Sequence, residues 1–345
     1  MKIIYDDIIY SLQRSGGISL YWSQLEKYLL CDIKLLYNNC KSNIFFIDDI
    51  LMQEKRRDIC IHFERYKNIQ LSEKSPFIFH SSYYRYCKNK NAVNITTVHD
   101  FVYEHFRRDI KSIVHKMQKR NAIYNSHGII FVSESTKNDF EFFYPNYKGE
   151  KKVIYHGVAP EYQKLNLARK SSVIFIGGRS PYKNFFYALK VMQKMPQFKL
   201  LIIGGGPLTK KEMIYLNRYV PDRYEHYQAL SNEELNLKYN EAYFLLYPSL
   251  YEGYGFPVVE AQAAGCPVAC CYVSSLPEAA GNAAVYISGK DVDGDVEKIS
   301  QLNNKNTYNF FVEKGLENCK KFTWKKCADE TYKFYEEVYN FYKKE

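Results

Sequence analysis

The fold class of this chain is indicated most clearly by the stretch Ala242-Tyr-Phe-Leu-Leu-Tyr-Pro-Ser-Leu-Tyr-Glu-Gly-Tyr-Gly-Phe-Pro-Val-Val-Glu260. Its beginning, Tyr243–Tyr247, predicts a buried strand because it is apolar and aromatic and ends at a proline. Its end, Val258 to Gly265, predicts a short helix. The loop between them contains two glycines and a proline. The free N–H groups at such a helix start suit a phosphate or another anion.

Two carboxylates lie eight positions apart in this stretch, Glu252 in the loop and Glu260 in the helix. A carboxylate does not help to bind an anion, so each needs another task. The helix around Glu260 is otherwise mostly apolar, and an acid there is costly unless it meets hydroxyls or a cation. We interpret both acids as functional; the alternative is a turn acid and a surface acid of the helix.

Strand and helix patterns alternate along the rest of the chain, which predicts an α/β protein with parallel sheets. A polar stretch, 161–172, separates two series of strands, and a length of 345 residues favours two domains. The first series comprises Lys2–Tyr5, Ile95–Val98, Gly128–Val132 and Val153–Tyr155. The second comprises Val173–Ile176, Leu200–Ile203, Tyr243–Tyr247 and Pro267–Cys270. Helices are expected at 292–302, 307–319 and 324 to about 342.

The composition is that of an ordinary globular protein, with 46% hydrophobic and 25% charged residues. The nine cysteines are scattered and form no paired CxxC motifs, which favours free thiols in a reducing compartment. No secretory signal is visible, and no apolar run reaches the roughly 18 residues of a membrane span. We therefore expect a cytoplasmic protein, with contact at a membrane surface as a further hypothesis.

Positive charge is concentrated in the first half of the chain. Residues 1–170 carry 27 Lys and Arg against 18 Asp and Glu, a net charge of +9 out of the total of +10. Such a field attracts nucleic acid, anionic lipid or a phosphorylated substrate. No RNA-binding motif is present, so nucleic acid is not an expected partner. Arg108, Lys111, His115 and Lys119 have helical spacing and could contact anionic lipid or a lipid-diphosphate acceptor; a solvated helix face is the alternative.

Several polar residues and glycines follow predicted strands, where ligands bind in open α/β sheets. Arg179 and Lys183 could both reach one phosphate, although a pair of surface cations beside a turn explains them as well. His99 ends a strand and could hydrogen-bond a sugar hydroxyl or a phosphate, and the alternative is a structural histidine. Gly16-Gly17 and Gly204-Gly-Gly206 are weak signals that also suit plain turns.

Taken together, these motifs resemble those of retaining nucleotide-sugar glycosyltransferases of the GT-B fold, family 4, of the type that builds bacterial surface polysaccharides. The resemblance covers nearly the whole chain, and the E-x7-E element that spans Glu252 to Glu260 is its most specific part. The other motifs are Ser15-Gly-Gly-Ile-Ser19, Thr97-Val-His-Asp100, Val132-Ser-Glu-Ser135, Phe175-Ile-Gly-Gly-Arg-Ser-Pro-Tyr-Lys-Asn184, Ile202-Ile-Gly-Gly-Gly206 and Phe322-Thr-Trp324.

The resemblance implies two Rossmann-like domains that face each other across a cleft. An N-terminal acceptor-side domain covers residues 1–165, together with a C-terminal helix at about 325–345 that crosses back to it. A nucleotide-sugar-binding domain covers residues 166–324. The donor is then a nucleotide-diphosphate sugar, and the acceptor is a saccharide or a lipid-linked saccharide.

The resemblance also implies a role for each matching residue. Arg179 and Lys183 correspond to the cations that hold the donor diphosphate, Glu252 to the acid that binds donor-sugar hydroxyls, and His99 to a residue at the reacting centre. Glu260 corresponds to the acid that binds the nucleotide ribose. The remaining implied donor-binding residues are Gly16, Gly17, Gly178, Leu230, Gly253, Tyr254, Gly255, Phe256, Pro257 and Val258.

These residue types suit the chemistry that the resemblance implies. Two cations and a helix N-terminus stabilise the negative charge that develops on a leaving diphosphate. Both acids are assigned to donor hydroxyls, so neither is an evident nucleophile, and we expect same-face attack with the leaving phosphate accepting the acceptor proton. No DxD motif stands out, and no metal or cofactor is expected. The alternatives are a GT-B nucleotide-sugar epimerase and a non-catalytic partner subunit.

Overall fold

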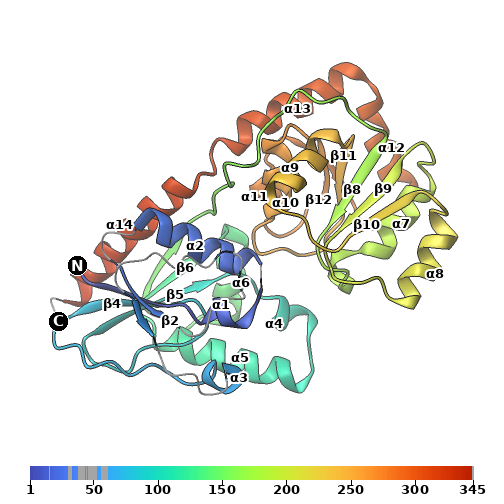
Figure 1. The fold of residues 1–345 in the computed structure, drawn as a ribbon. Coiled ribbons are helices and arrows are strands. Elements are labelled where there is room, and N and C mark those ends of the chain that lie inside the picture. The colour runs from blue at the N-terminus through green and yellow to red at the C-terminus, as the bar shows by residue number, and fades with distance from the viewer. Residues whose placement is uncertain are drawn as a thin grey trace. The chain divides into compact units, whose positions relative to one another are not determined.

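The computed structural model describes residues 1–14, 16–29, 33–37, 43, 45, 53–55 and 61–343 (Figure 1). The chain forms two compact units. Unit 1 comprises Met1–Gly157 and Trp324–Glu345, and unit 2 comprises Val158–Thr323. None of the described helices is both long and apolar enough to cross a membrane.

Unit 1 is built on a parallel sheet that has seven strands in the described part of the chain, in the order β3-β2-β1-β4-β5-β6-β7. Its strands are β1 (Ile3–Asp6), β2 (Ile33–Tyr37), β3 (Gln53–Lys55), β4 (Phe77–Ser81), β5 (Ala92–Val98), β6 (Gly128–Phe131) and β7 (Glu150–Val153). Its helices are α1 (Ile8–Leu12), α2 (Gly17–Leu29), α3 (Ile61–Glu64), α4 (Val102–Phe106), α5 (Ile110–Tyr124), α6 (Glu134–Phe143) and α14 (Trp324–Tyr342). Strands β1, β4, β5 and β6 are buried along their whole length, as expected for a parallel sheet covered on both faces.

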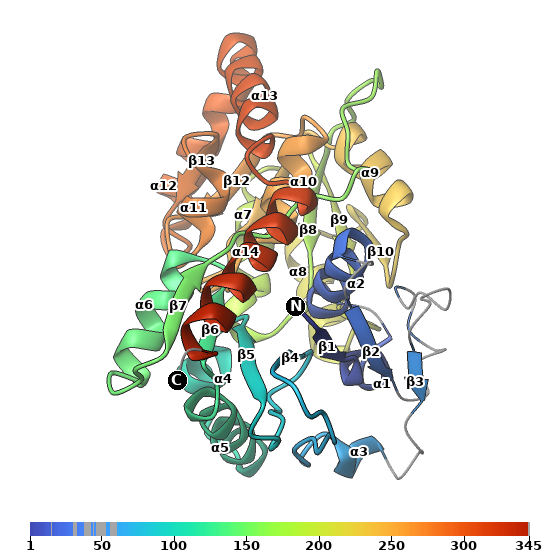
Figure 2. The same cartoon turned by 90° about the vertical axis from the view of Figure 1, so that its left-hand side faces the viewer.

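The last helix, α14, packs on unit 1, beside α2 and the sheet (Figure 2). Tyr335 of α14 is fully buried, and its hydroxyl lies 2.9 Å from the Tyr5 hydroxyl and 2.6 Å from His80 Nδ1. A buried hydroxyl needs such partners, so these bonds specify how α14 docks on the sheet.

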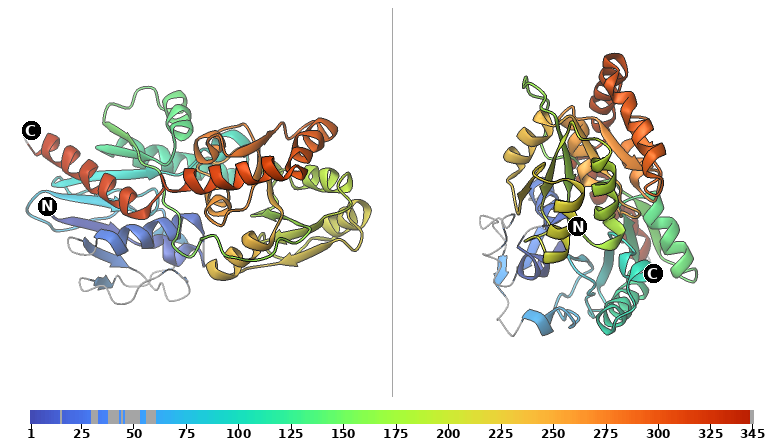
Figure 3. Two further views of the ribbon diagram at one scale, coloured as in Figure 1. Left: turned by 90° about the horizontal axis from the view of Figure 1, so that it is seen from above. Right: turned by 90° about the vertical axis from the view of Figure 1, so that its right-hand side faces the viewer.

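Unit 2 contains a six-stranded parallel sheet in the order β10-β9-β8-β11-β12-β13. Its strands are β8 (Ser172–Ile176), β9 (Lys199–Ile203), β10 (Tyr224–Tyr227), β11 (Phe244–Tyr247), β12 (Val268–Cys271) and β13 (Ala284–Ile287). Its helices are α7 (Phe185–Gln193), α8 (Lys210–Tyr219), α9 (Asn232–Glu241), α10 (Phe256–Ala263), α11 (Leu276–Ala280), α12 (Val292–Ser300) and α13 (Lys305–Cys319), with 3₁₀ turns η1 (Pro181–Lys183) and η2 (Gln301–Asn303). Figure 3 shows the ribbon from two further directions.

The boundary between the units differs from the predicted one at 165/166, because residues 158–165 bond to unit 2. The Val158 N–H donates to the Phe322 carbonyl at 3.1 Å, and the Leu165 N–H donates to Asn240 Oδ1 at 2.6 Å. The chain therefore enters unit 2 directly after Gly157 and returns to unit 1 at Trp324. The predicted strand 153–155 was also misplaced, since β7 occupies Glu150–Val153. This edge strand is exposed and charged, so apolar content did not mark it.

Candidate active site

The candidate site of unit 2 lies where the order of the strands reverses. From the neighbouring strands β8 and β11 the chain proceeds to β9 on one side and to β12 on the other. Ligands in open α/β sheets bind at the carboxyl ends of strands at such a switch point. Gly177 follows β8, Gly204 follows β9, and Tyr247 ends β11. The topology thus gathers three of the sequence motifs at one edge of the sheet.

Lys183 and Glu252 form an ion pair at this edge. Lys183 Nζ lies 2.6 and 2.8 Å from the two carboxylate oxygens of Glu252, and 3.2 Å from the Tyr247 hydroxyl. Their side chains are 15% and 12% exposed, so the pair is largely withdrawn from water yet still reachable. The ammonium also lies 5.4 Å from the Tyr247 ring centroid. Burial and the Glu252 charge raise the pKa of Tyr247, which keeps its hydroxyl protonated.

The loop that carries Glu252 is held by two serines and by the turn before Lys183. The Glu252 N–H donates to Ser274 Oγ at 2.9 Å, and Ser275 Oγ donates to the carbonyls of Glu252 and Tyr254 at 2.9 Å each. The Leu250 N–H donates to the Tyr182 carbonyl at 2.7 Å. These bonds join the Lys183 turn and the Glu252 loop into one structure, which preorganises the ion pair.

Helix α10 begins directly after this loop without a side-chain cap. Its N-cap is Gly255, with φ of 108°, and Pro257 occupies the first turn. A Cβ at Gly255 would lie 3.1 Å from Leu276 Cδ2, in a backbone conformation that favours glycine. An uncapped N-terminus with a positive dipole end favours an anion, as expected for a phosphate site. The predicted helix from Val258 therefore begins two residues earlier, at Phe256.

Arg179 does not present an open cation in this structure. Its Nε donates to Glu212 Oε1 at 2.8 Å, and its two terminal nitrogens donate to four carbonyls of the following glycine loop, Gly204–Pro207. Its side chain is only 4% exposed. Gly204, Gly205 and Gly206 all have positive φ, which turns their carbonyls toward the guanidinium. The geometry gives Arg179 a role in shaping this loop, and its predicted contact with the diphosphate stays a prediction.

Glu260 is buried inside α10, with 7% of the residue exposed. Its nearest polar partner is the Tyr239 hydroxyl, which donates to Oε2 at 3.4 Å. Burial raises the pKa of Glu260 from its ordinary 4.5 to about 7, and the Tyr239 bond opposes this rise. A carboxyl with a single long hydrogen bond keeps acceptor capacity for further hydroxyls.

Two other predicted donor-binding residues of unit 2 are placed as follows. Gly178 faces open space, since a Cβ there would meet nothing within 4 Å. Leu230 is half-buried between β10 and the Ser231 cap of α9. Gly178 therefore lies just after β8, at the switch point. Leu230 lies after β10, which is an outer strand of the sheet.

His99 of unit 1 lies at the carboxyl end of β5, beside a cavity of about 230 Å³. Its ring is 5.3 Å from that of Tyr21 and 5.8 Å from that of His156, measured between centroids. Burial and the positive charge of Lys119 lower the pKa of His99 to about 3. A lowered pKa favours the neutral imidazole at neutral pH, which suits a hydrogen bond to a hydroxyl.

The cavity beside His99 is lined by polar and aromatic side chains of unit 1. Two of its donors, Gln13 Nε2 and Arg65 Nε, are buried and lack a hydrogen-bond partner within the described residues. Gly16 and Gly17 lie at the adjoining start of α2, where the Gly16 carbonyl accepts from Ser19 Oγ at 3.1 Å; Ser15 of the same motif lies outside the described residues. The full lining is Ile9, Leu12, Gln13, Ile18, Arg65, Ser81, Ser82, Tyr83, Tyr84, Thr97, His99, Asp100, Tyr103 and His115.

Sequence reasoning missed the residues that act through tertiary contacts. Ser274 and Ser275 hold the Glu252 loop, Glu212 binds Arg179, and Tyr239 contacts Glu260. No sequence signal links these residues to their partners. Tyr247 was the exception, because a polar tip at the end of a buried strand could have indicated it.

Comparison with known proteins identifies the family of this chain. Residues 159–318 match the family model described as glycosyl transferases group 1. An uncharacterized glycosyltransferase of Methanocaldococcus jannaschii is 30% identical over 360 aligned residues, which cover 98% of this chain and 99% of that protein. The chain belongs to the group 1 glycosyltransferases. O-antigen chain mannosyltransferase B of Escherichia coli is 31% identical over 194 residues, and that match covers 51% of this chain and only 48% of the mannosyltransferase.

Solved structures confirm the fold class of this glycosyltransferase. Sucrose-phosphate synthase from Thermosynechococcus elongatus has a TM-score of 0.76 at 17% identity, covering 99% of this chain and 100% of that one. HepE of Anabaena, solved with UDP and glucose, has a TM-score of 0.74 at 13% identity, covering 98% of this chain and 100% of that one. The prediction of a GT-B fold, with two parallel-sheet α/β domains, is confirmed.

Proposed function

We propose that this chain is a retaining hexosyltransferase that moves a sugar from a nucleotide-diphosphate donor to a saccharide or lipid-linked saccharide in surface-glycan synthesis. The ion pair of Lys183 and Glu252 beside the uncapped start of α10 carries the proposal. It combines a cation for the phosphate with an acid for sugar hydroxyls at the carboxyl ends of two neighbouring strands, β8 and β11. Similarity to O-antigen mannosyltransferases makes mannose the first sugar to test.

In the proposed reaction the diphosphate leaves the sugar carbon while an acceptor hydroxyl attacks the same face. Lys183 and the α10 dipole stabilise the charge that develops on the leaving phosphate. Glu252 accepts hydrogen bonds from sugar hydroxyls, and Glu260 accepts them from the ribose. The acceptor hydroxyl attacks the sugar directly, so no side chain of the enzyme has to act as nucleophile. Its proton passes to the leaving phosphate, so no side chain has to act as general base.

We place the acceptor in the unit 1 cavity next to His99. The neutral imidazole and the unpartnered donors of Gln13 and Arg65 suit an oxygen-rich ligand. The absence of a metal requirement stays part of the proposal. We also propose a cytoplasmic location with peripheral contact to membrane, since the cysteines of the described residues are free thiols and a lipid-linked acceptor resides in a bilayer.

The test is a donor screen with UDP-, GDP- and dTDP-sugars that follows release of the nucleoside diphosphate and identifies the sugar product. Glu252→Ala is expected to abolish transfer while the thermal unfolding midpoint stays close to that of the parent protein. Glu313→Ala, an exposed acid on α13, is the matched control and should keep activity. Full transfer by folded Glu252→Ala contradicts the site, and an epimerised nucleotide sugar without acceptor would favour the epimerase.

A further inference from the structure

Helix α5 of unit 1 presents an apolar stripe to solvent instead of to the core. Ile110, Ile113, Val114 and Met117 recur at the i, i+3, i+4, i+7 spacing of one helix face, and they are 80%, 52%, 40% and 66% exposed. The opposite face packs inward through Ser112, Lys119, Ala122 and Ile123. Such a stripe normally faces the core of a globular protein. Its exposure marks an interaction surface.

Cations flank this stripe on both sides. Lys111 and Arg120 are exposed on α5, and Arg107 and Arg108 are exposed just before it. Within the described residues, none of these cations forms a salt bridge. From Ile110 to Tyr124 the helix contains no acidic residue. An apolar stripe between rows of cations is the pattern of a helix that lies in a bilayer interface.

The structure corrects the basic stripe that the sequence suggested. Lys119 is fully buried, and its ammonium pairs with Glu104 at 3.0 Å. The His115 ring stacks on Tyr103 with centroids 4.0 Å apart, and burial lowers the pKa of His115 to about 3. Only Arg108 and Lys111 of the original four face solvent.

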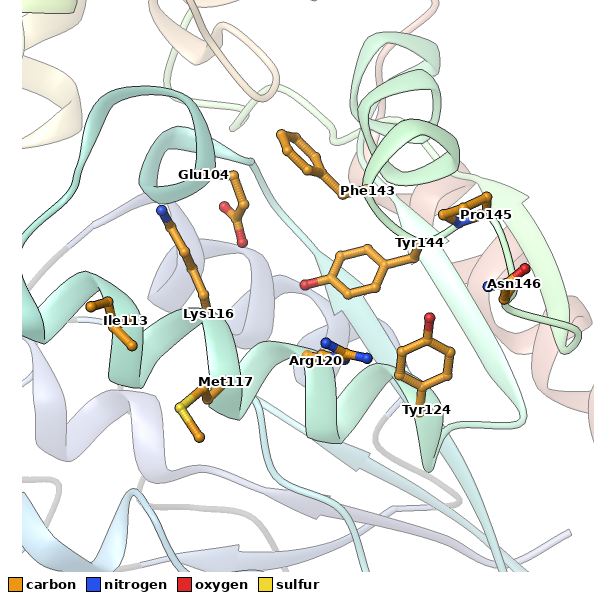
Figure 4. Close-up of a pocket in the computed structure, with 10 residues that line it drawn as sticks. All are labelled: Glu104, Ile113, Lys116, Met117, Arg120, Tyr124, Phe143, Tyr144, Pro145 and Asn146. Carbon is orange, nitrogen blue, oxygen red and sulfur yellow. The ribbon is translucent and has the colours of Figure 1, made fainter.

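A groove of about 510 Å³ lies directly beside the stripe (Figure 4). Lys116, Met117 and Arg120 line it from α5, and residues 143–146, at the end of α6 and in the turn after it, line it from the opposite side. The carboxylate of Glu104 also lines the groove, and its charge is compensated by the buried Lys119 at 3.0 Å. Lys116 and Arg120 place cations in the groove next to the apolar side chains. This combination suits a phosphate headgroup whose acyl chains continue along the stripe.

We propose that the α5 face, defined as Arg107, Arg108, Ile110, Lys111, Ile113, Val114, Met117 and Arg120, docks on an anionic lipid bilayer. Charge selects this occupant over a second copy of the chain. In a symmetric dimer through α5 the cations of the two copies would face each other with only the exposed Asp109 of each copy to offset them, whereas anionic headgroups neutralise both rows. The inference rests on the membrane contact in the proposed function and names the surface that makes it. Docking on lipid requires neither donor nor transfer, so vesicle binding and sugar transfer can fail independently.

Co-sedimentation of the full chain with vesicles tests the proposal. We expect binding to phosphatidylcholine vesicles that contain about 30 mol % phosphatidylglycerol, weaker binding to pure phosphatidylcholine, and loss of binding as salt rises. The charge variant Arg108→Gln/Lys111→Gln/Arg120→Gln should bind anionic vesicles about a hundredfold more weakly. The apolar variant Ile110→Ser/Met117→Ser should bind at least about tenfold more weakly.

The matched control is Met213→Ser/Ile214→Ser on α8 of unit 2, where the two side chains are 41% and 66% exposed. It should bind vesicles like the parent protein. All substituted side chains are exposed, so thermal unfolding should change little. Equal binding of the parent protein to neutral and anionic vesicles overturns the proposal, as does undiminished binding by both α5 variants. An apolar variant that dissolves a dimer while vesicle binding persists assigns the face to a second copy.

Discussion

Lys183 Nζ lies within 2.8 Å of both carboxylate oxygens of Glu252, although 69 residues separate the two in sequence. The pair joins the turn after β8 to the loop after β11 at the reversal of strand order. In the proposed function, donor binding inserts phosphate beside the ammonium and sugar hydroxyls beside the carboxylate. On that proposal, each charge of the pair compensates the other until the donor binds.

Removing the cation of this pair should slow transfer more than it weakens folding. We expect Lys183→Ala to lower kcat/KM by about 10²–10³, because one preorganised electrostatic contact to the leaving group is lost. Steady-state release of the nucleoside diphosphate measures this. Lys190→Ala, a lysine in the last turn of α7, is the control and should be neutral. A Lys183→Ala enzyme with parent activity would exclude the proposed role.

Arg179 allows a test between loop shaping and direct contact with phosphate. Arg179→Lys cannot reproduce bonds to four carbonyls and to Glu212, so we expect a loss of about 1–3 kcal/mol in the free energy of unfolding. Gly205→Ala should produce a similar loss, since its Cβ would clash with the Arg179 guanidinium at a positive φ. Chemical denaturation measures both variants.

The alternative for Arg179 gives a different pattern. If its main role were direct stabilisation of the leaving phosphate, Arg179→Lys would lower kcat at saturating donor and leave stability intact. Gly206→Ala separates backbone strain in the loop from a clash with Arg179. Its φ is positive like that of Gly205, but nothing lies within 4 Å of the position of its Cβ.

Glu260 should make stability depend on pH. Its carboxyl is protonated up to about pH 7 in the folded chain but only to about 4.5 when unfolded. Unfolding therefore releases a proton between these pH values, and stability falls as pH rises from 4.5 to 7, by on the order of 3 kcal/mol. Denaturation as a function of pH measures the slope, and Glu260→Gln should flatten it. An unchanged slope in Glu260→Gln would contradict the assignment.

Donor affinity should also depend on the ionisation of Glu260, but in the opposite direction from stability: it should rise with pH. In the proposed site the ribose hydroxyls donate to the ionised carboxylate, so binding should weaken as pH falls below about 7, by up to about tenfold per pH unit. Calorimetry with the nucleoside diphosphate selected by the donor screen measures this dependence. Glu260→Gln should bind more weakly and without the pH dependence.

Removal of divalent ions should leave transfer intact. In the proposed site Lys183 and the α10 N-terminus supply the positive charge that would stabilise the leaving diphosphate. We expect the rate with excess EDTA to equal the untreated rate. A loss of activity that Mg²⁺ or Mn²⁺ restores would contradict the proposed metal-free reaction.

The fold class could be predicted from local sequence patterns, namely apolar runs for buried strands and glycines at tight loops. Buried strands such as β11 are apolar along their length, and the strand–loop–helix unit at Glu252 has its glycines where a tight loop needs them. The edge strands gave weaker signals: β7 is charged and β10 is only half-buried, so neither shows the apolar run of a central strand.

Site residues were predictable where local sequence marks a strand end, and not where the partner is distant. The sequence placed Lys183, Glu252 and Glu260 as candidates without linking the first two. It treated Arg179 as an open cation. In the structure the guanidinium is surrounded by the backbone carbonyls of Gly204–Pro207 and by the Glu212 carboxylate. Hydrogen bonds between segments depend on strand order, which local pattern does not encode.

The sequence by itself determined that this protein is an α/β chain with two series of strands and an acidic strand–loop–helix element, because periodicity and glycine placement are local properties. Tertiary structure alone decided that Lys183 pairs with Glu252, that Arg179 shapes the glycine loop, and that the apolar stripe of α5 faces solvent. Burial is a property of the assembled sheet and its covering helices. A helix with an apolar stripe can turn that stripe inward or outward, and only the packing of its other face decides which.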